Sequence, residues 1–108
     1  VMLDCAMEQR EGVLCVSLCG EIDHHAATLV RAKIDARILA YEPKLVVLDL
    51  SAVSFMDSSG IGLILGRHRM LKSLGGTLSI RGVSPQTAKL LRIAGIEGIM
   101  ESKGEVKQ

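Results

Sequence analysis

The chain has 108 residues, of which 48% are hydrophobic and only two, Tyr41 and Phe55, are aromatic, and its net charge is +1. A chain of this length forms one domain around its own core, here an aliphatic one. Two rings are too few for a surface that stacks single-stranded nucleic acid, and interspersed acids and bases leave no basic stripe for a phosphate backbone. We therefore expect no nucleic-acid partner.

The three cysteines, Cys5, Cys15 and Cys19, lack the spacing of a disulfide framework. An odd number is typical of free thiols in a reducing cytoplasm. Because there is neither a signal-peptide pattern nor an apolar run of about 20 residues, we expect a cytoplasmic protein without a membrane anchor. Cys15 and Cys19 would lie about 13 Å apart on a strand, too far to share a zinc ion, so buried thiols are expected instead.

The first half of the chain has the pattern of a hairpin followed by a helix. Apolar residues alternate with polar ones over 3–7, and a turn at 11–12 leads to a second apolar run over 13–19. Two strands joined by so short a turn predict a hairpin. Apolar residues at helical spacing predict a helix over about 26–40, which ends before Pro43.

The second half alternates strands and helices. The near-continuous apolar run 45–50 is typical of a strand covered on both faces, and a helix is expected over 58–72. A short strand over 77–80 follows, and Ser84-Pro85 supplies an N-cap and a first-turn proline for a third helix. Residues 96–100 are expected to add a short edge strand.

Strands that alternate with helices indicate parallel, right-handed crossover connections. We therefore predict a single α/β domain over residues 1–108, with a mixed sheet of four or five strands and the N-terminal hairpin at its edge. The main helices should cover one face of this sheet. The polar tail 101–108 is expected to fray or to form a weak last helical turn.

The most informative segment runs from Ser54 to Arg67 and contains Asp57-Ser58-Ser59-Gly60 at a predicted helix start. Aspartate and serine are preferred N-caps, and any of these three polar residues suits that role. Helical spacing predicts a buried face, which comprises Ile61, Ile64, Leu65, His68 and Leu71.

The opposite side of the same helix carries two interior glycines, Gly62 and Gly66. Each is about 0.5–1 kcal/mol less favourable than alanine in a helix interior. Either the helix packs closely on its own sheet, or another protein's backbone approaches it there. Leu63 and Met70 are expected to form an apolar strip beside the serines, which is a plausible docking surface.

This segment, preceded by Gly20-Glu21-Ile22-Asp23-His24-His25, resembles the anti-sigma factor antagonists of spore-forming bacteria. Within that family, it is most similar to the branch that acts in sporulation. These proteins are STAS domains (sulphate transporter and anti-sigma factor antagonist). The resemblance covers the chain from the first hairpin to Gly95. It implies a partner, an anti-sigma factor that is also a serine kinase, which the unphosphorylated protein binds so that a sigma factor is released. It further implies that phosphorylation of Ser58 ends the binding and that a phosphatase acts on Ser58.

We therefore expect a regulatory protein with no catalytic residue, no metal and no cofactor. Its expected partner surface comprises Glu21, Asp23, Asp57, Ser58, Ser59, Gly62, Leu63, Gly66 and Met70. The two acids that follow the second strand are either solvated loop residues or contacts for a basic residue on the kinase. Arg67 and Arg69 are expected to be surface charges.

Two other classes of function remain open. One is a small nucleotide-binding or hydrolytic enzyme that uses the helix start between Ser58 and Gly66. A dinucleotide site is disfavoured by the nine residues 51–59 between the predicted strand and Gly60, and a hydrolase by the lack of a Gly-x-Ser-x-Gly elbow around Ser58. The other is a STAS regulator of a stress-response pathway.

Overall fold

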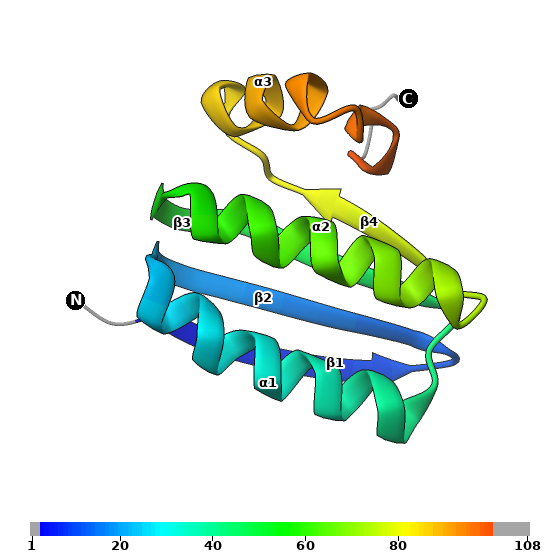
Figure 1. Ribbon diagram of the computed structural model, residues 1–108. Helices are drawn as coiled ribbons and strands as arrows, with labels where there is room; N and C mark the ends of the chain where they lie inside the picture. Colours follow the sequence, from blue (N-terminus) through cyan, green and yellow to red (C-terminus); the bar gives the residue numbers. More distant parts are fainter. Residues whose placement is uncertain (1–2, 101–108) are drawn as a thin grey trace.

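The computed structural model describes residues 3–100 and contains four strands and three α-helices within that range (Figure 1). The strands are β1 (Leu3–Arg10), β2 (Val13–Ile22), β3 (Leu45–Met56) and β4 (Thr77–Arg81). The helices are α1 (His24–Tyr41), α2 (Ser58–Ser73), α3 (Pro85–Ile93) and the short 3-10 helix η1 (Glu97–Ile99). The predicted α/β class is confirmed, while the prediction for the tail 101–108 lies outside the described residues.

The sheet has the order β1-β2-β3-β4, with β1 antiparallel to β2 and the other two pairs parallel. The predicted hairpin is confirmed, and its turn places Glu11 and Gly12 at φ values of 52° and 83°. The expected edge strand over 96–100 is wrong. Residues 97–99 form a 3-10 turn closed by a bond from Ile99 N to Ile96 O, which leaves a single bridge between Met100 and Ile80.

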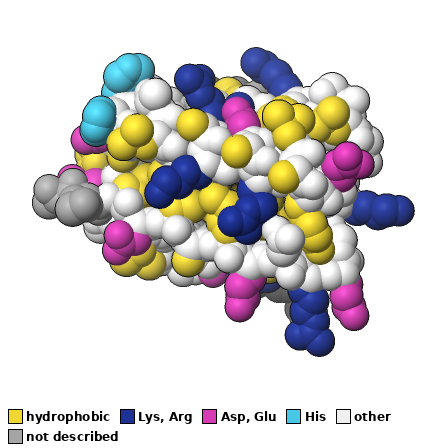
Figure 2. All heavy atoms as spheres, turned by 90° about the horizontal axis from the view of Figure 1, so that it is seen from below, with side chains coloured by type: hydrophobic (Ala, Val, Ile, Leu, Met, Phe, Trp, Pro, Cys, Tyr) yellow, Lys and Arg dark blue, Asp and Glu magenta, His cyan; other side chains and the backbone are white. Residues whose placement is uncertain are grey.

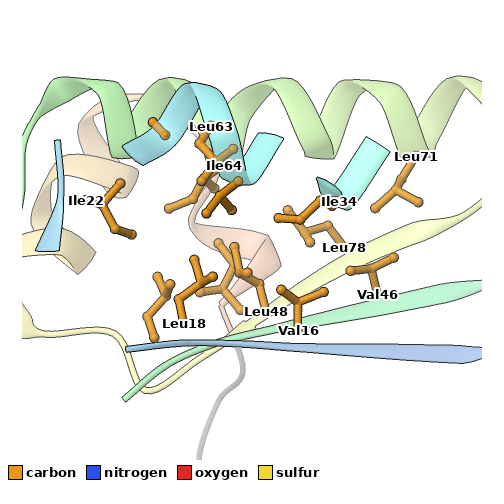
Figure 3. Close-up of a cluster of buried hydrophobic side chains, with 14 of the residues drawn as sticks. Val16, Leu18, Ile22, Ile34, Val46, Leu48, Leu63, Ile64, Leu71 and Leu78 are labelled. Carbon is orange, nitrogen blue, oxygen red and sulfur yellow. The ribbon is translucent and has the colours of Figure 1, made fainter. Parts of the chain in front are cut away.

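Helices α1 and α2 lie side by side over one face of the sheet, and α3 lies beyond β4 (Figure 1). Alternate residues of β2, β3 and β4 point toward these helices and form the core (Figure 3). The core side chains from the sheet are Leu14, Val16, Leu18, Ile22, Val46, Leu48, Leu50, Leu78 and Ile80. Because the two long helices share one face, the run 45–50 is not covered by helices on both sides. Val47 is nevertheless buried on the other face, between strand neighbours.

β2 and β3 extend further than their apolar runs predicted. β2 continues to Ile22 and β3 to Met56, and the added residues pair with each other through Glu21↔Phe55 and Ile22↔Met56. Backbone pairing stabilises this extension although its residues are mostly polar or small, so the hydrophobic pattern did not reveal it. As a result, both helices of the covered face start at the same edge of the sheet.

Candidate functional site

The starts of α1 and α2 are built in the same way. Asp23 Oδ1 accepts a hydrogen bond from Ala26 N at 2.8 Å, and Asp57 Oδ1 accepts one from Ser59 N at 2.8 Å. A backbone bond from Asp57 N to Ile22 O, 3.2 Å long, ties the two strand ends together. Two helix N-termini, each with partial positive charge, therefore lie at one edge of the sheet.

The two serines of the motif have different environments. Ser58 is exposed as the first residue of α2, and because Asp57 is the N-cap, the Ser58 hydroxyl is not needed for capping. Ser59 is partly buried, with its Oγ 3.5 Å from Nδ1 of His24, the first residue of α1. The structure thus decides among the three possible caps and leaves Ser58 accessible to another protein.

The buried face of α2 differs from the predicted one. Leu63 is only 4% exposed, and Met70 is partly buried against the core, so the expected apolar docking strip is wrong. Leu65 and His68, expected on the buried face, are only half-buried. The reason is that α1 packs along the flank of α2, so the helix buries a flank toward α1 as well as the side toward the sheet.

Gly62 and Gly66 lie on the open side of α2. A Cβ atom added at either position would meet nothing within 4 Å, so close packing on the protein's own sheet does not explain them. Gly60 is different, because its Cβ would overlap the side chain of Met56. Close packing on the sheet, one of the two explanations that the sequence left open for Gly62 and Gly66, is therefore wrong, and approach by another protein stays a prediction.

These glycines form one wall of a cleft of about 270 Å³ between α1 and α2. The α1 wall carries a histidine and an arginine, and the α2 wall carries the second serine and another arginine. The cleft is lined by His24, Ala27, Thr28, Arg31, Ser59, Gly62, Leu63, Gly66 and Arg67. It opens directly beside the serine pair.

The expectation that Arg67 is a surface charge is wrong. Its side chain is 10% exposed, and its Nε lies 2.9 Å from Oδ1 of Asp35 on α1. Burial lowers the pKa of Arg67, the nearby Asp35 carboxylate raises it, and the charge of Arg31 lowers it. Sequence periodicity could not reveal this pair, because its two members lie on different helices.

The acidic residues of the expected surface are placed by the strand ends. Glu21 is half-buried within β2 rather than in a loop, Asp23 is exposed as the cap of α1, and Asp57 is half-buried as the cap of α2. Because Ile22 points into the core, Glu21 points to the helix-free face beside Phe55, its register partner on β3. Phe55 is 51% exposed beside Glu21, and the sequence analysis did not single it out.

The loop-length argument against a dinucleotide site is wrong. β3 runs to Met56, so only Asp57 separates the strand from α2. The argument that remains is chemical: about 20 residues beyond the glycines, where that fingerprint has an acid for the ribose, β4 ends in Arg81.

The cysteines do not form a site. Cys5 and Cys15 are partly buried, but Cys19 is exposed, so the expectation of buried thiols is wrong for Cys19. It lies near the end of β2, where the pairing with β3 is irregular. Within residues 3–100, no three His, Cys, Asp or Glu side chains are grouped so that they could hold a metal ion. No helix in that range is long and apolar enough to span a bilayer.

The STAS domain family model matches residues 4–108, and the chain belongs to this family. It is 41% identical over 98 residues to the anti-sigma F factor antagonist of Paenibacillus polymyxa, which covers 91% of this chain and 84% of that protein. It is 33% identical over 95 residues to the anti-sigma-B factor antagonist of Bacillus subtilis (strain 168), covering 88% and 85% of the two chains.

Comparison with solved structures leads to the same family. The unphosphorylated form of the anti-sigma factor antagonist SpoIIAA superposes with a TM-score of 0.80 at 33% identity and covers 94% of this chain and 90% of that one. The phosphorylated form of the Bacillus cell fate determinant SpoIIAA superposes with a TM-score of 0.79, covering 94% of both chains. The predicted family and the four-stranded fold with an N-terminal hairpin are therefore confirmed.

Proposed function

We propose that this protein is an anti-sigma factor antagonist that is switched by phosphorylation of Ser58. In its unphosphorylated form it binds an anti-sigma factor, itself a serine kinase, and a sigma factor is released. The observation that carries the proposal is the exposed Ser58 at the first position of α2, with Asp57 as the cap and an open glycine-lined helix face beside it. The names of the relatives support it.

Among the pathways open to this family, the sporulation type has the stronger support. Identity to the named anti-sigma F antagonist is 41%, against 33% for the named anti-sigma-B antagonist, over chain lengths that are nearly equal. Titration against purified anti-sigma factors of both types distinguishes the pathways. Tighter binding to a sigma-B-type partner would place the protein in a stress-response pathway instead.

The enzymatic alternative has one observation in its favour, the approach of His24 to Ser59, which resembles a nucleophile and its base. A triad also needs an acid that orients the base, and Asp23 is engaged instead with the backbone of Ala26. Incubation with ATP, GTP and ester substrates in the absence of any partner tests this alternative. Turnover that is lost in Ser59→Ala, which removes the hydroxyl beside His24, would favour it.

Phosphorylation is expected to act at the interface rather than by unfolding the site. A phosphoserine adds about −1.5 to −2 charges at neutral pH. At an exposed helix start that charge is stabilised by about 0.3–1 kcal/mol, so α2 should stay folded. A partner surface that fits a neutral hydroxyl must then desolvate a dianion, which weakens binding.

The experiment is phosphate mapping by mass spectrometry after reaction with the partner kinase and ATP, on wild type, Ser58→Ala and Ser59→Ala. Phosphate is expected on wild type and Ser59→Ala, at Ser58 only. Ser58→Ala should fold, bind the kinase and stay bound when ATP is added, whereas Ser58→Asp should bind weakly. A phosphatase is expected to restore binding of the phosphorylated wild type. Phosphate on Ser59 alone would disprove the assignment.

Amide chemical shifts of the two forms test the local mechanism. Changes confined to the surroundings of Ser58, including the start of α1, are expected. Shifts that spread through β1 and β4 would show that the switch is conformational.

A further inference from the structure

The cleft between α1 and α2 carries excess positive charge. The guanidinium groups of Arg31 and Arg67 both line it, and the carboxylate of Asp35 is the acid that pairs with Arg67. At the end of the cleft that holds His24 and Ser59, the carboxylates of Asp23 and Asp57 cap the two helix N-termini and offset their partial positive charge. The excess of positive charge therefore lies further along the cleft, where two guanidinium groups are set against the one carboxylate of Asp35.

Arg67 also has unused hydrogen-bonding capacity. Its side chain is nine-tenths buried, and its Nη1 has no hydrogen-bond partner among the described residues. Nε and the carboxylate of Asp35 approach as an ion pair without forming a hydrogen bond. A buried donor without an acceptor is destabilising, and more so when the group is charged. A carboxylate fits this donor, because guanidinium groups bind carboxylates through paired hydrogen bonds.

The α2 wall of the cleft, which also carries Arg67, is open at backbone level. Because Gly62 and Gly66 have no side chains, another chain can approach the backbone of α2 closely at these positions. An added Cβ atom at either glycine would meet nothing within 4 Å, so packing inside this protein does not require glycine there. The cleft is lined by Ser59, the neighbour of Ser58 in the chain, so a partner that binds at Ser58 would lie close to it.

We propose that an aspartate or glutamate side chain of the partner kinase enters this cleft and pairs with Arg67 and Arg31, while the partner's backbone lies against Gly62 and Gly66. This inference rests on the proposed function, because it assigns chemistry to the partner of that same surface. It gives the partner an orientation. A basic group of the kinase faces Glu21 on the sheet side of Ser58, and an acidic group enters the cleft on the helix side.

The α1 helix supplies a matched control. Lys33 is two residues from Arg31 and is also exposed, but it lines a different hollow, together with Cys5 and Met7 of β1. Figure 2 shows basic side chains over hydrophobic ones on the face formed by α1 and β1, with the histidines at one end. Arg31→Ala and Lys33→Ala therefore remove the same charge from opposite flanks of one helix.

The test is titration of the purified partner kinase with wild type, Arg31→Ala and Lys33→Ala, each at two salt concentrations. Arg31→Ala is expected to raise Kd by about tenfold or more and to reduce its salt dependence, because it removes one member of an interfacial charge pair. Lys33→Ala should change Kd less than about twofold. Neither substitution should alter the melting temperature appreciably, because both side chains are exposed.

The partner's acid is then located by alanine substitution of acidic residues on the kinase. One of them should lose little further affinity when combined with Arg31→Ala, which is the coupling expected of a direct pair. If wild type binds the kinase and Arg31→Ala binds equally well, the cleft inference is wrong while the proposed function stands. If wild type binds no anti-sigma kinase, the proposed function itself fails. If inorganic phosphate binds at Arg31 and leaves the Kd for the kinase unchanged, the cleft is a site for a free anion and the inference is overturned.

Discussion

Gly66→Ala separates the stability of the fold from its function. Because the added Cβ meets nothing within 4 Å, the substitution introduces no clash. Alanine is more favourable than glycine in a helix interior by about 0.5–1 kcal/mol, so the free energy of unfolding should rise by that amount. With an unfolding entropy of about 2.1 cal/mol/K per residue, the melting temperature should rise by about 2–4 °C for a chain of 108 residues.

The same methyl group should weaken partner binding. It occupies the open wall of the cleft, where the proposed partner backbone lies, and overpacking of a close contact costs about 1–3 kcal/mol. That range corresponds to a rise in Kd of about 5- to 150-fold. Isothermal titration with the partner kinase measures Kd, and calorimetric melting of the free protein measures stability.

Two further glycines supply the controls. Gly98→Ala places a methyl group in open space in η1, outside the cleft, and should leave Kd unchanged. Gly60→Ala should lower the melting temperature, because its Cβ overlaps Met56. If Gly66→Ala is stabilising but binds like wild type, the open face of α2 is not the partner surface. A fall in melting temperature would mean that Gly66 has a packing role that the geometry does not contain.

Three other substitutions test the remaining architecture. Asp57→Ala removes the cap of α2 and should lower the free energy of unfolding by about 0.5–2 kcal/mol in chemical denaturation. Ser58→Ala should lower it far less, because Ser58 does not cap the helix. Asp35→Ala leaves Arg67 buried without its counter-ion and should lower the free energy of unfolding by about 1–3 kcal/mol in chemical denaturation, and an unchanged value would show that the pair does not stabilise the fold. Hydrogen bonds from the side chain and backbone of Ser51 lower the pKa of Asp49, so Asp49 contributes stability above its unfolded pKa that is lost as pH falls through the folded value. Ser51→Ala should raise this pKa in a carboxyl NMR titration, and an unchanged titration would contradict the assigned cause.

Features governed by neighbours in the chain could be predicted from the sequence. The hairpin turn at 11–12 and the start of α3, where Ser84 Oγ accepts a bond from Thr87 N at 3.1 Å, depend on local backbone and capping chemistry. The start of α2 at Ser58 also came from its own polar residues, whereas the expectation that Ser58 is the phosphoacceptor came from the resemblance to the family. In each case the residues that determine the structure lie within a few positions of one another.

The sequence by itself therefore determined the order of the elements, the fold family and the position of the serine motif. Only the tertiary structure decided which way α2 faces: α1 packs along its flank, so Leu63 and Arg67 are buried and Gly62 and Gly66 remain open. The pair of Arg67 with Asp35 joins residues 32 positions apart, and no local period encodes such a contact. The cleft beside Ser58 exists only because two strands end together and set two helices side by side, so its charge and shape follow from packing between elements rather than from any one of them.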